Sequence, residues 1–417
     1  MRWRRSGRPR SAARKTHRAI GEGGRLKIAL AWSGPPTLDR ISFRHEHYVA
    51  GFEALGHDVV MVTPRELAGT FGGATVLVPD GESMQKVSTW REIAADVALA
   101  VTWHRLSPML EAITAAGTRV LALADSDGQV GFAAHPRVSW IRIASRMTSA
   151  RERFRALRYF FRRYAASRQR RDPEEHEFVA STRASHRVFL GSGPAIGAFE
   201  RFLGQQRVPE LAARLREVPF AVPDLFCVQP LPPKIDQAVA IGRWSDPQKD
   251  APLLAAALET YFRASRDSRA PRASRETRVV IFGADAEATF GGLAAREPRL
   301  ELAGIQEPDV VSTTLARSRV ALFSSRWETG PHAATEALAL GATLVAPPMP
   351  NFEGMIDRGA FGTLASERSP QVLAAALGRE MALWESGARD AGAIAAHWRA
   401  RVSPRAVCHT LLAGLAD

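Results

Sequence analysis

Residues 324–341 read SSRWETGPHAATEALALG and directly follow the apolar run Arg319–Phe323. A short apolar run that ends in small polar residues is typical of a buried β-strand. The segment from Pro331 to Leu340 favours a helix, because Pro is common in the first turn of a helix and Gly341 is a typical terminator. The order strand, loop, helix is the repeating unit of a parallel sheet covered by helices.

The same alternation extends over most of the chain. Further strands are expected at 27–32, 58–62, 96–101, 119–123, 187–190, 238–241, 278–282, 300–302 and 343–346, with helices at 48–55, 108–116 and 252–263. The polar stretch 268–277 is expected to be an exposed loop. The predicted fold class is therefore α/β, with two Rossmann-like doubly wound domains and a ligand site in the cleft between them.

The chain divides into five expected segments. Five prolines between Pro219 and Pro233 indicate a linker between the two halves. The segments are a disordered basic arm over 1–26, an N-terminal domain over 27–222 with an Arg-rich helix at 142–171, a Pro-rich linker over 223–235, a C-terminal domain over 236–395, and a C-terminal helix over 396–417.

Composition excludes several classes of protein. The chain has 417 residues, of which 46% are hydrophobic, so it can bury large cores without disulfides or metals. Cys227 and Cys408 are its only cysteines, which excludes a disulfide-framed scaffold and a Cys-rich zinc or iron–sulfur site. A reducing cytosol is the expected compartment. No apolar run reaches about 18 residues, so no transmembrane helix is expected.

The net charge of +13 is concentrated in two segments. Residues 1–18 contain eight Lys and Arg and no acid, and residues 142–171 contain eleven Arg and one Glu. The rest of the chain is mildly acidic, so the basic balance does not indicate a nucleic-acid surface over the whole body. No nucleic-acid partner is expected.

The basic segment 142–171 also has an amphipathic pattern. Phe154, Leu157, Phe161 and Tyr164 lie on one helical stripe surrounded by Arg. Two interpretations remain open, because this stripe could pack on the N-terminal domain or dock on an anionic membrane surface. The second interpretation predicts a cytoplasmic protein that associates peripherally with the inner face of the membrane.

Two groups of residues in the second half indicate one anionic ligand. Arg243 and Lys249 follow Gly242 at the end of an expected strand, where they could clamp a diphosphate or simply be two solvated cations. Glu328 lies in the loop before the helix at Pro331, and Glu336 lies within that helix. Gly330 permits close approach of a ligand to the backbone, and the free amides of the first helical turn can bind phosphate.

These residues resemble the retaining GT-B glycosyltransferases of family 4, also called glycosyl transferases group 1. Gly242-Arg243 with Lys249 is similar to the diphosphate site of that family, and Glu328 through Glu336 is similar to its Glu-x7-Glu element. The continuation Ala337–Gly341 and the strand-end residues Gly283 and Gly304 are also similar to the family pattern, as is Leu55–Val59 in the first half.

The resemblance implies a GT-B fold with an N-terminal acceptor domain and a C-terminal nucleotide-sugar donor domain that face a central cleft. It implies that Glu328 faces the donor sugar, that Glu336 faces the ribose, and that Arg243 and Lys249 hold the diphosphate. The implied binding set at the loop and helix start comprises Gly330, Pro331, His332 and Ala333, and the strand-end set comprises Gly242, Gly283 and Gly304. No metal or cofactor is implied, because the nucleotide-diphosphate sugar is a co-substrate.

The sequence departs from the family pattern at two loops. Ser33-Gly34-Pro35-Pro36 replaces the usual Gly-Gly, and Thr329-Gly330-Pro331 replaces Phe-Gly after the first Glu. On the acceptor side the assisting residue is expected to be His104, Asp125 or Asp127. Asp125-Ser126-Asp127 also matches a metal-binding Asp-x-Asp pattern, but the two-domain alternation argues against that fold.

The expected function is transfer of a sugar from a nucleotide-diphosphate sugar to an unknown acceptor, lipid-linked or polysaccharide, with retention of configuration. Chemistry would rest on Glu328, Arg243 and Lys249. The alternatives are a nucleotide-sugar epimerase or hydrolase on the same fold, and a catalytically inactive GT-B-like module that binds lipid or a partner.

Overall fold

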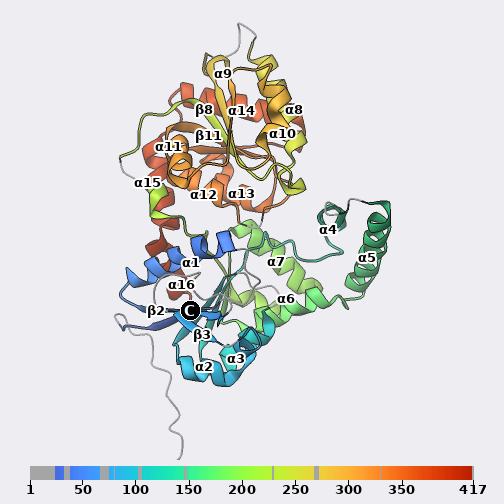
Figure 1. Cartoon of the computed structure of the whole chain (residues 1–417), viewed down its shortest axis with the longest axis vertical. Coiled ribbons are helices and arrows are strands. Elements are labelled where there is room, and N and C mark those ends of the chain that lie inside the picture. The colour runs from blue at the N-terminus through green and yellow to red at the C-terminus, as the bar shows by residue number, and fades with distance from the viewer. Residues whose placement is uncertain are drawn as a thin grey trace, which may run out of the picture.

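The structure is a computed structural model that describes residues 24–31, 38–65, 75–78, 80–101, 106–144, 147, 149–227, 230–266, 272–328 and 330–415. The chain forms two α/β domains, drawn one above the other in Figure 1, each built on a parallel sheet with helices on both faces. The predicted fold class is confirmed. Most of the basic arm and the loop at Ser33–Pro36 lie outside the described residues.

The N-terminal domain contains a seven-stranded sheet in the order β3-β2-β1-β4-β5-β6-β7. Its strands are β1 (Lys27–Ala31), β2 (Asp58–Pro64), β3 (Thr75–Val78), β4 (Val97–Val101), β5 (Arg119–Leu123), β6 (Arg187–Leu190) and β7 (Leu215–Glu217). All neighbouring strands are parallel. Strand β4 is buried throughout, as expected for a central parallel strand covered on both faces. The main helices are α1 (Leu38–Glu53), α2 (Val87–Ile93), α3 (Ser107–Ala115), α6 (Pro173–Ala184) and α7 (Gly193–Gln205).

The C-terminal domain contains a six-stranded sheet in the order β10-β9-β8-β11-β12-β13. Its strands are β8 (Ile235–Ile241), β9 (Arg278–Phe282), β10 (Leu300–Gly304), β11 (Ser318–Leu322), β12 (Thr343–Ala346) and β13 (Gly362–Leu364). Its helices are α8 (Ala251–Ala264), α9 (Arg272–Glu276), α10 (Ala286–Ala294), α11 (Pro308–Arg317), α12 (His332–Ala339), α13 (Pro350–Ile356) and α14 (Pro370–Glu385). The strand order reverses between β8 and β11, and between β1 and β4 in the other domain. Such reversals leave a crevice where ligands bind in doubly wound sheets.

The expected exposed loop at 268–277 is wrong in part, because α9 forms within it. The Arg272 guanidinium lies 2.6 Å from Glu276, one helical turn further on, and 3.6 Å from Asp236 on β8. It also lies 3.7 Å from Glu385. These partners give a charged segment a fixed place on the domain surface, which its polar composition alone did not predict.

The C-terminal segment is two helices and not the single helix expected over 396–417. Helix α15 (Ala391–Val402) ends at Ser403, whose extended ψ of 147° precedes Pro404, and α16 (Pro404–Ala413) follows. The residue before a proline is disfavoured in helical conformation, which explains the break. Helix α16 returns to the N-terminal domain, where Cys408 is buried in the core and contacts α1.

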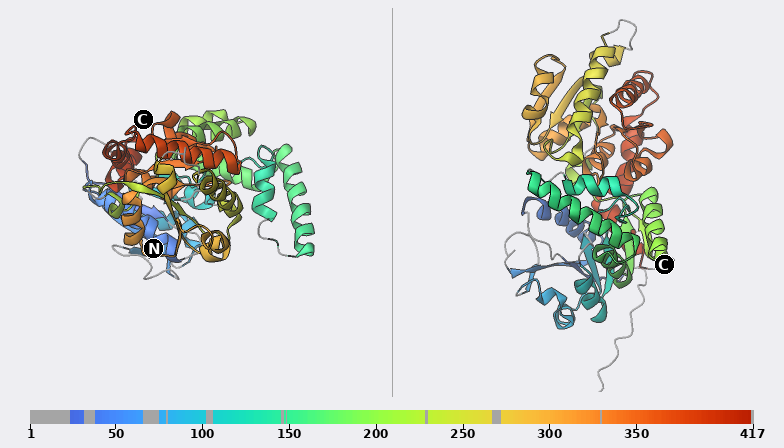
Figure 2. Two further views of the ribbon diagram at one scale, coloured as in Figure 1. Left: turned by 90° about the horizontal axis from the view of Figure 1, so that it is seen from above. Right: turned by 90° about the vertical axis from the view of Figure 1, so that its right-hand side faces the viewer.

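The Arg-rich segment is also two helices, α4 (Pro136–Ala144) and α5 (Ala150–Arg168). A new helix begins because Ser149 and Glu152 form a capping box, in which each side chain accepts from the other backbone amide at 3.2 and 3.0 Å. Figures 1 and 2 show α4 and α5 projecting together from one side of the molecule. Across the described ranges, no helix is both long and apolar enough to cross a bilayer.

The stripe predicted on this segment faces outward over most of its length. Phe154 is 71% exposed and Phe161 is 59% exposed. Tyr164 instead stacks on Phe160, and Phe160 contacts Trp140 of α4. The interpretation that the whole stripe packs on the N-terminal domain is therefore wrong. Docking on a membrane stays a prediction.

Candidate functional site

The predicted binding residues of the C-terminal domain follow adjacent strands at one edge of the sheet. Gly242, Gly283 and Gly304 end β8, β9 and β10, which are neighbours. Gly283 has φ +111°, and a Cβ there would collide with the Gly242 carbonyl. The Gly283 amide donates to the Gly304 carbonyl at 2.6 Å. Only glycine at position 283 lets the backbones after β8 and β9 approach so closely.

The loop after β8 is anchored by Trp244 and Asp246. The Trp244 indole donates to the Phe282 carbonyl at 2.9 Å and packs edge-on against Phe290. Asp246 accepts from the Gln248 amide at 2.9 Å and caps the short 3-10 helix η5 (Pro247–Lys249). Its other oxygen accepts from Arg243 at 3.0 Å, and the Arg243 side chain stays 51% exposed.

Lys249 and Glu328 meet at the reversal of strand order between β8 and β11. The Lys249 Nζ donates to Glu328 Oε1 at 2.6 Å, and the Ser325 hydroxyl donates to the same oxygen at 2.5 Å. Gln248 Nε2 donates to Glu328 Oε2 at 3.2 Å and to the Trp327 carbonyl at 2.9 Å. Glu328 is buried, and both its oxygens accept hydrogen bonds, so its carboxylate is held in one position.

The loop before α12 contacts the N-terminal domain through Phe220. A Cβ on Gly330 would collide with the Phe220 ring, and the His332 ring lies 4.9 Å from that ring. Pro331 is the N-cap of α12, and Ala333 lies half-buried in its first turn. The predicted loop and helix start therefore lie at the junction of the two domains.

Glu336 is buried in α12 apart from the other charged site residues. It is 8% exposed. Burial raises the pKa of Glu336 to about 7. Its predicted contact with a ribose stays a prediction.

Of the three acceptor-side candidates, Asp127 has the best-defined surroundings. It is buried, and it accepts from the Gln129 amide at 3.1 Å. Burial raises the pKa of Asp127, and the nearby Arg142 opposes that rise. Asp125 is half-buried, and His104 lies outside the described residues. The roles of all three stay predictions.

Arg142 lies between Asp127 of the N-terminal domain and Trp327 of the C-terminal domain. Its guanidinium lies 4.0 Å from Asp127 and 5.2 Å from the centre of the Trp327 ring, in the position of a cation–π contact. Burial lowers the pKa of Arg142. The sequence showed Arg142 only as one of eleven Arg in a basic run, so nothing in the pattern marked it as a site residue.

Sequence reasoning also missed the residues that hold the donor loop in place. The Asn351 side-chain amide donates to the Glu328 carbonyl at 2.9 Å. Asp250 accepts from Arg326 at 2.8 Å and from Arg368 at 2.6 Å. Arg368 is more than forty positions from Arg326, so no local pattern could have linked the two.

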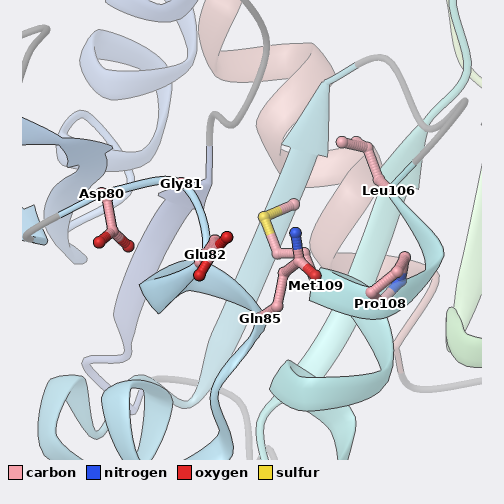
Figure 3. Close-up of a pocket in the computed structure, with 7 residues that line it drawn as sticks. All are labelled: Asp80, Gly81, Glu82, Gln85, Leu106, Pro108 and Met109. Atoms are coloured by element: carbon pink, nitrogen blue, oxygen red, sulfur yellow. The ribbon is translucent and has the colours of Figure 1, made fainter.

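A cavity of 590 Å³ lies beyond the carboxyl ends of β3 and β4 in the N-terminal domain (Figure 3). Its lining residues are Asp80, Gly81, Glu82, Gln85, Leu106, Pro108 and Met109. The Asp80 carboxylate accepts from the Ser83 amide at 2.7 Å and its hydroxyl at 2.8 Å. Carboxylate and amide groups at this wall suit a polar ligand rich in hydroxyl groups. No cluster of three or more metal-ligating side chains occurs among the residues the structure describes.

A family match lies within the second half of the chain. Residues 236–382 match the family described as glycosyl transferases group 1. No curated protein matches the sequence significantly.

Among solved structures, the chain is similar to HepE of Anabaena in complex with UDP and glucose, with a TM-score of 0.57 and 14% identity over 94% of this chain and 99% of that one. It is similar to a glycosyltransferase of Rickettsia africae, with a TM-score of 0.62 and 10% identity over 94% of this chain and 98% of that one. It is also similar to the lipopolysaccharide outer core galactosyltransferase WaaB, with a TM-score of 0.56 and 13% identity over 94% and 99%. At these identities the likeness establishes a shared two-domain fold.

Proposed function

We propose that this chain, which has a GT-B fold and matches the glycosyl transferases group 1 family over residues 236–382, transfers a sugar from a nucleoside-diphosphate sugar to a hydroxyl acceptor with retention of configuration. The observation that carries the proposal is the contact of Lys249 with Glu328 at the reversal of strand order. A similar structure, HepE, is known with UDP and with UDP-glucose, which favours a uridine donor.

In this proposal the donor diphosphate accepts hydrogen bonds from Lys249 and Arg243. The half-exposed Arg243 guanidinium can turn from Asp246 toward a phosphate, since it is held there by a single contact at 3.0 Å. Glu328 then accepts hydrogen bonds from hydroxyls of the donor sugar. The N-terminal end of the α12 dipole adds partial positive charge beside the diphosphate.

During transfer, the bond between the anomeric carbon and the diphosphate oxygen breaks as the bond to the acceptor oxygen forms. The acceptor proton passes to the departing diphosphate, so no charge is left on the product sugar. Negative charge grows on the diphosphate in the transition state, and Arg243 and Lys249 are placed to stabilise it. Retention is proposed on the resemblance to the family, and it requires the acceptor to attack the same face of the sugar from which the diphosphate departs.

The test is a panel of nucleoside-diphosphate sugars with the full chain. We expect one donor to raise the melting temperature, because ligand binding stabilises the folded state by mass action. Release of nucleoside diphosphate should then depend on an added acceptor extract and should yield a glycosylated product. Breakdown or epimerisation of the donor without an acceptor would support the alternative hydrolase or epimerase. Absence of binding by every donor would support the inactive module.

We further propose that helix α5 holds the enzyme at an anionic membrane surface. Phe154, Leu157 and Phe161 are exposed by 71%, 39% and 59%, and they lie among arginines on a helix that projects from the body. Aromatic side chains partition into the bilayer interface, and arginines pair with lipid phosphates. An acceptor attached to a membrane lipid would fit this location.

A further inference from the structure

A groove of 610 Å³ lies between the Arg-rich segment and the donor domain. Trp140, Ile141 and Ala144 of α4 form one wall. Pro247, Ala251 and Pro252, at the start of α8, belong to the opposite wall. These side chains are apolar, and the polar lining residues are Ser245, Asp246, Asp250, Thr289 and Arg326. Pockets of about 300–1,000 Å³ that combine apolar walls with a few polar groups are typical of small-molecule sites.

Ring contacts connect the groove to the exposed aromatic side chains of α5. The Trp140 ring packs edge-on against Phe160 with centroids 5.3 Å apart. Phe160 packs in the same way against Phe161 at 5.6 Å, and Phe161 is 59% exposed. An apolar path therefore runs from the surface that would meet a membrane into the space between the domains.

Positive charge gathers beside the groove. Arg326, Asp246 and Asp250 line the groove. Asp250 is shared by Arg326 and Arg368, and Asp246 is paired with Arg243, so three cations face two anions. The Arg326 side chain is 34% exposed, and a guanidinium has five N–H donors, which leaves it able to bind a further anion. Arg142, the neighbour of Ile141 in sequence, lies over Trp327, the neighbour of Arg326. A ligand of the groove should therefore be apolar along its length and anionic at one end.

We propose that this groove binds a membrane lipid that carries a phosphate, and that this lipid is the anchor of the acceptor. The hydrocarbon chain lies along Trp140 and Ile141, and the phosphate accepts from Arg326. Only Trp327 separates Arg326 from Glu328 in sequence, so a sugar attached to that phosphate lies near the donor sugar. This inference rests on the proposed transfer reaction, for which it names the class of acceptor.

The test uses the full chain and farnesyl phosphate, a phosphate monoester with a fifteen-carbon chain, below its micelle concentration. Binding is measured by titration calorimetry, with inorganic phosphate and farnesol as comparison ligands. We expect farnesyl phosphate to bind at least tenfold more tightly than either of them, because it engages both the apolar wall and the arginine. Equal affinity for farnesol would show that no phosphate site exists, and equal affinity for inorganic phosphate would show that no chain site exists. Either result overturns the proposal.

Two groove variants locate the site. Ile141→Glu places a charge on the apolar wall, and Ala144→Trp fills the groove without adding charge, so the second remains informative if the first misfolds. Each should weaken farnesyl phosphate binding at least tenfold, whereas Arg263→Gln, an exposed change at the far end of α8, should leave it unchanged. Unchanged binding in a folded Ala144→Trp protein would overturn the proposal.

UDP binding is measured on the same samples to separate this inference from the proposed function. Both groove variants should bind UDP as the unmodified chain does, because neither residue belongs to the proposed donor site. If the unmodified chain binds farnesyl phosphate but no nucleotide, the proposed transfer reaction is wrong and the proposed lipid site in the groove is supported. If it binds UDP but not farnesyl phosphate, the groove proposal alone is wrong.

Discussion

The Lys249 Nζ lies 2.6 Å from Glu328 Oε1, so the cation proposed for the donor diphosphate is paired with the carboxylate proposed for the donor sugar. Lys249 is 20% exposed and Glu328 is 6% exposed by side chain, which shields the pair from solvent. An incoming donor would exchange this ion pair for two contacts of its own. The pair therefore keeps each charge satisfied until a ligand that supplies both a diphosphate and hydroxyl groups arrives.

We expect Glu328→Gln to reduce transfer by roughly 10²–10³-fold, the effect of losing one charged transition-state contact. The amide has nearly the same shape, so the protein should fold normally. Its weaker hold on Lys249 should leave UDP affinity equal or higher. Initial rates and UDP titrations on one preparation check both parts, with Glu301→Gln on β10 as an exposed control. Turnover near that of the unmodified enzyme would remove Glu328 from the site.

Arg243→Ala and Lys249→Ala should each weaken UDP binding or transfer by about 2–4 kcal/mol. The two losses should be non-additive, because both cations contact one diphosphate. Affinity and rate for the two single variants and the double variant decide this. Arg266→Ala removes another exposed ion-paired arginine and serves as the control. If each single change costs less than about 0.5 kcal/mol and the two costs add, Arg243 and Lys249 are ordinary surface cations.

The two cations should differ in their effect on stability. Lys249→Ala leaves the buried Glu328 without its cation, whereas Arg243→Ala removes a half-exposed ion pair with Asp246. Loss of one partner of a buried pair is the more destabilising change. Urea denaturation should therefore give a clearly lower midpoint for Lys249→Ala than for Arg243→Ala. Equal midpoints would contradict the structural role of the Lys249–Glu328 pair.

The sequence was sufficient to predict the two sheets because central parallel strands are continuous apolar runs. Strand β5 (Arg119–Leu123) and strand β9 (Arg278–Phe282) have the predicted bounds. Strands β3, β7 and β13 were not predicted. They are three or four residues long and depend on pairing with a neighbour more than on their own composition.

The site could be predicted only where its residues are close in sequence. Lys249 and Glu328 were each marked by a loop after a strand, but their contact depends on β8 and β11 being neighbours. The contacts of Arg142 with Asp127 and Trp327 depend on the helix start at Ser149, which makes α4 and α5 separate helices. The groove beside Arg326 requires both domains, and no local pattern carries that information.

Glu336 should make stability fall as pH rises. Its folded pKa of about 7 lies above the ordinary value of 4.5, so the folded protein holds a proton that the unfolded chain releases between these values. The resulting stabilisation is fully present below about pH 4.5 and is lost as pH rises through 7, a difference of about 3 kcal/mol at most. Glu336→Gln should remove this dependence and raise the melting temperature more at pH 8 than at pH 5. Parallel pH profiles for the two proteins would contradict this.

Helix α5 should bind anionic vesicles in a way that depends on both its arginines and its aromatic side chains. Each basic residue near a charged surface contributes roughly 1 kcal/mol, so co-sedimentation with phosphatidylserine vesicles should be strong at low salt and fall as salt screens the arginines.

The double variant Phe154→Asp with Phe161→Asp should bind much less, because it removes the exposed aromatic groups and adds negative charge. Ile305→Asp is the matched control, since Ile305 is 77% exposed on the other domain. Transfer to a short water-soluble acceptor should be unaffected by the double change, because Phe154 and Phe161 are exposed on a helix that projects from the body. Equal sedimentation with neutral vesicles, or equal losses in the Ile305→Asp control, would show that α5 is not a membrane-binding helix.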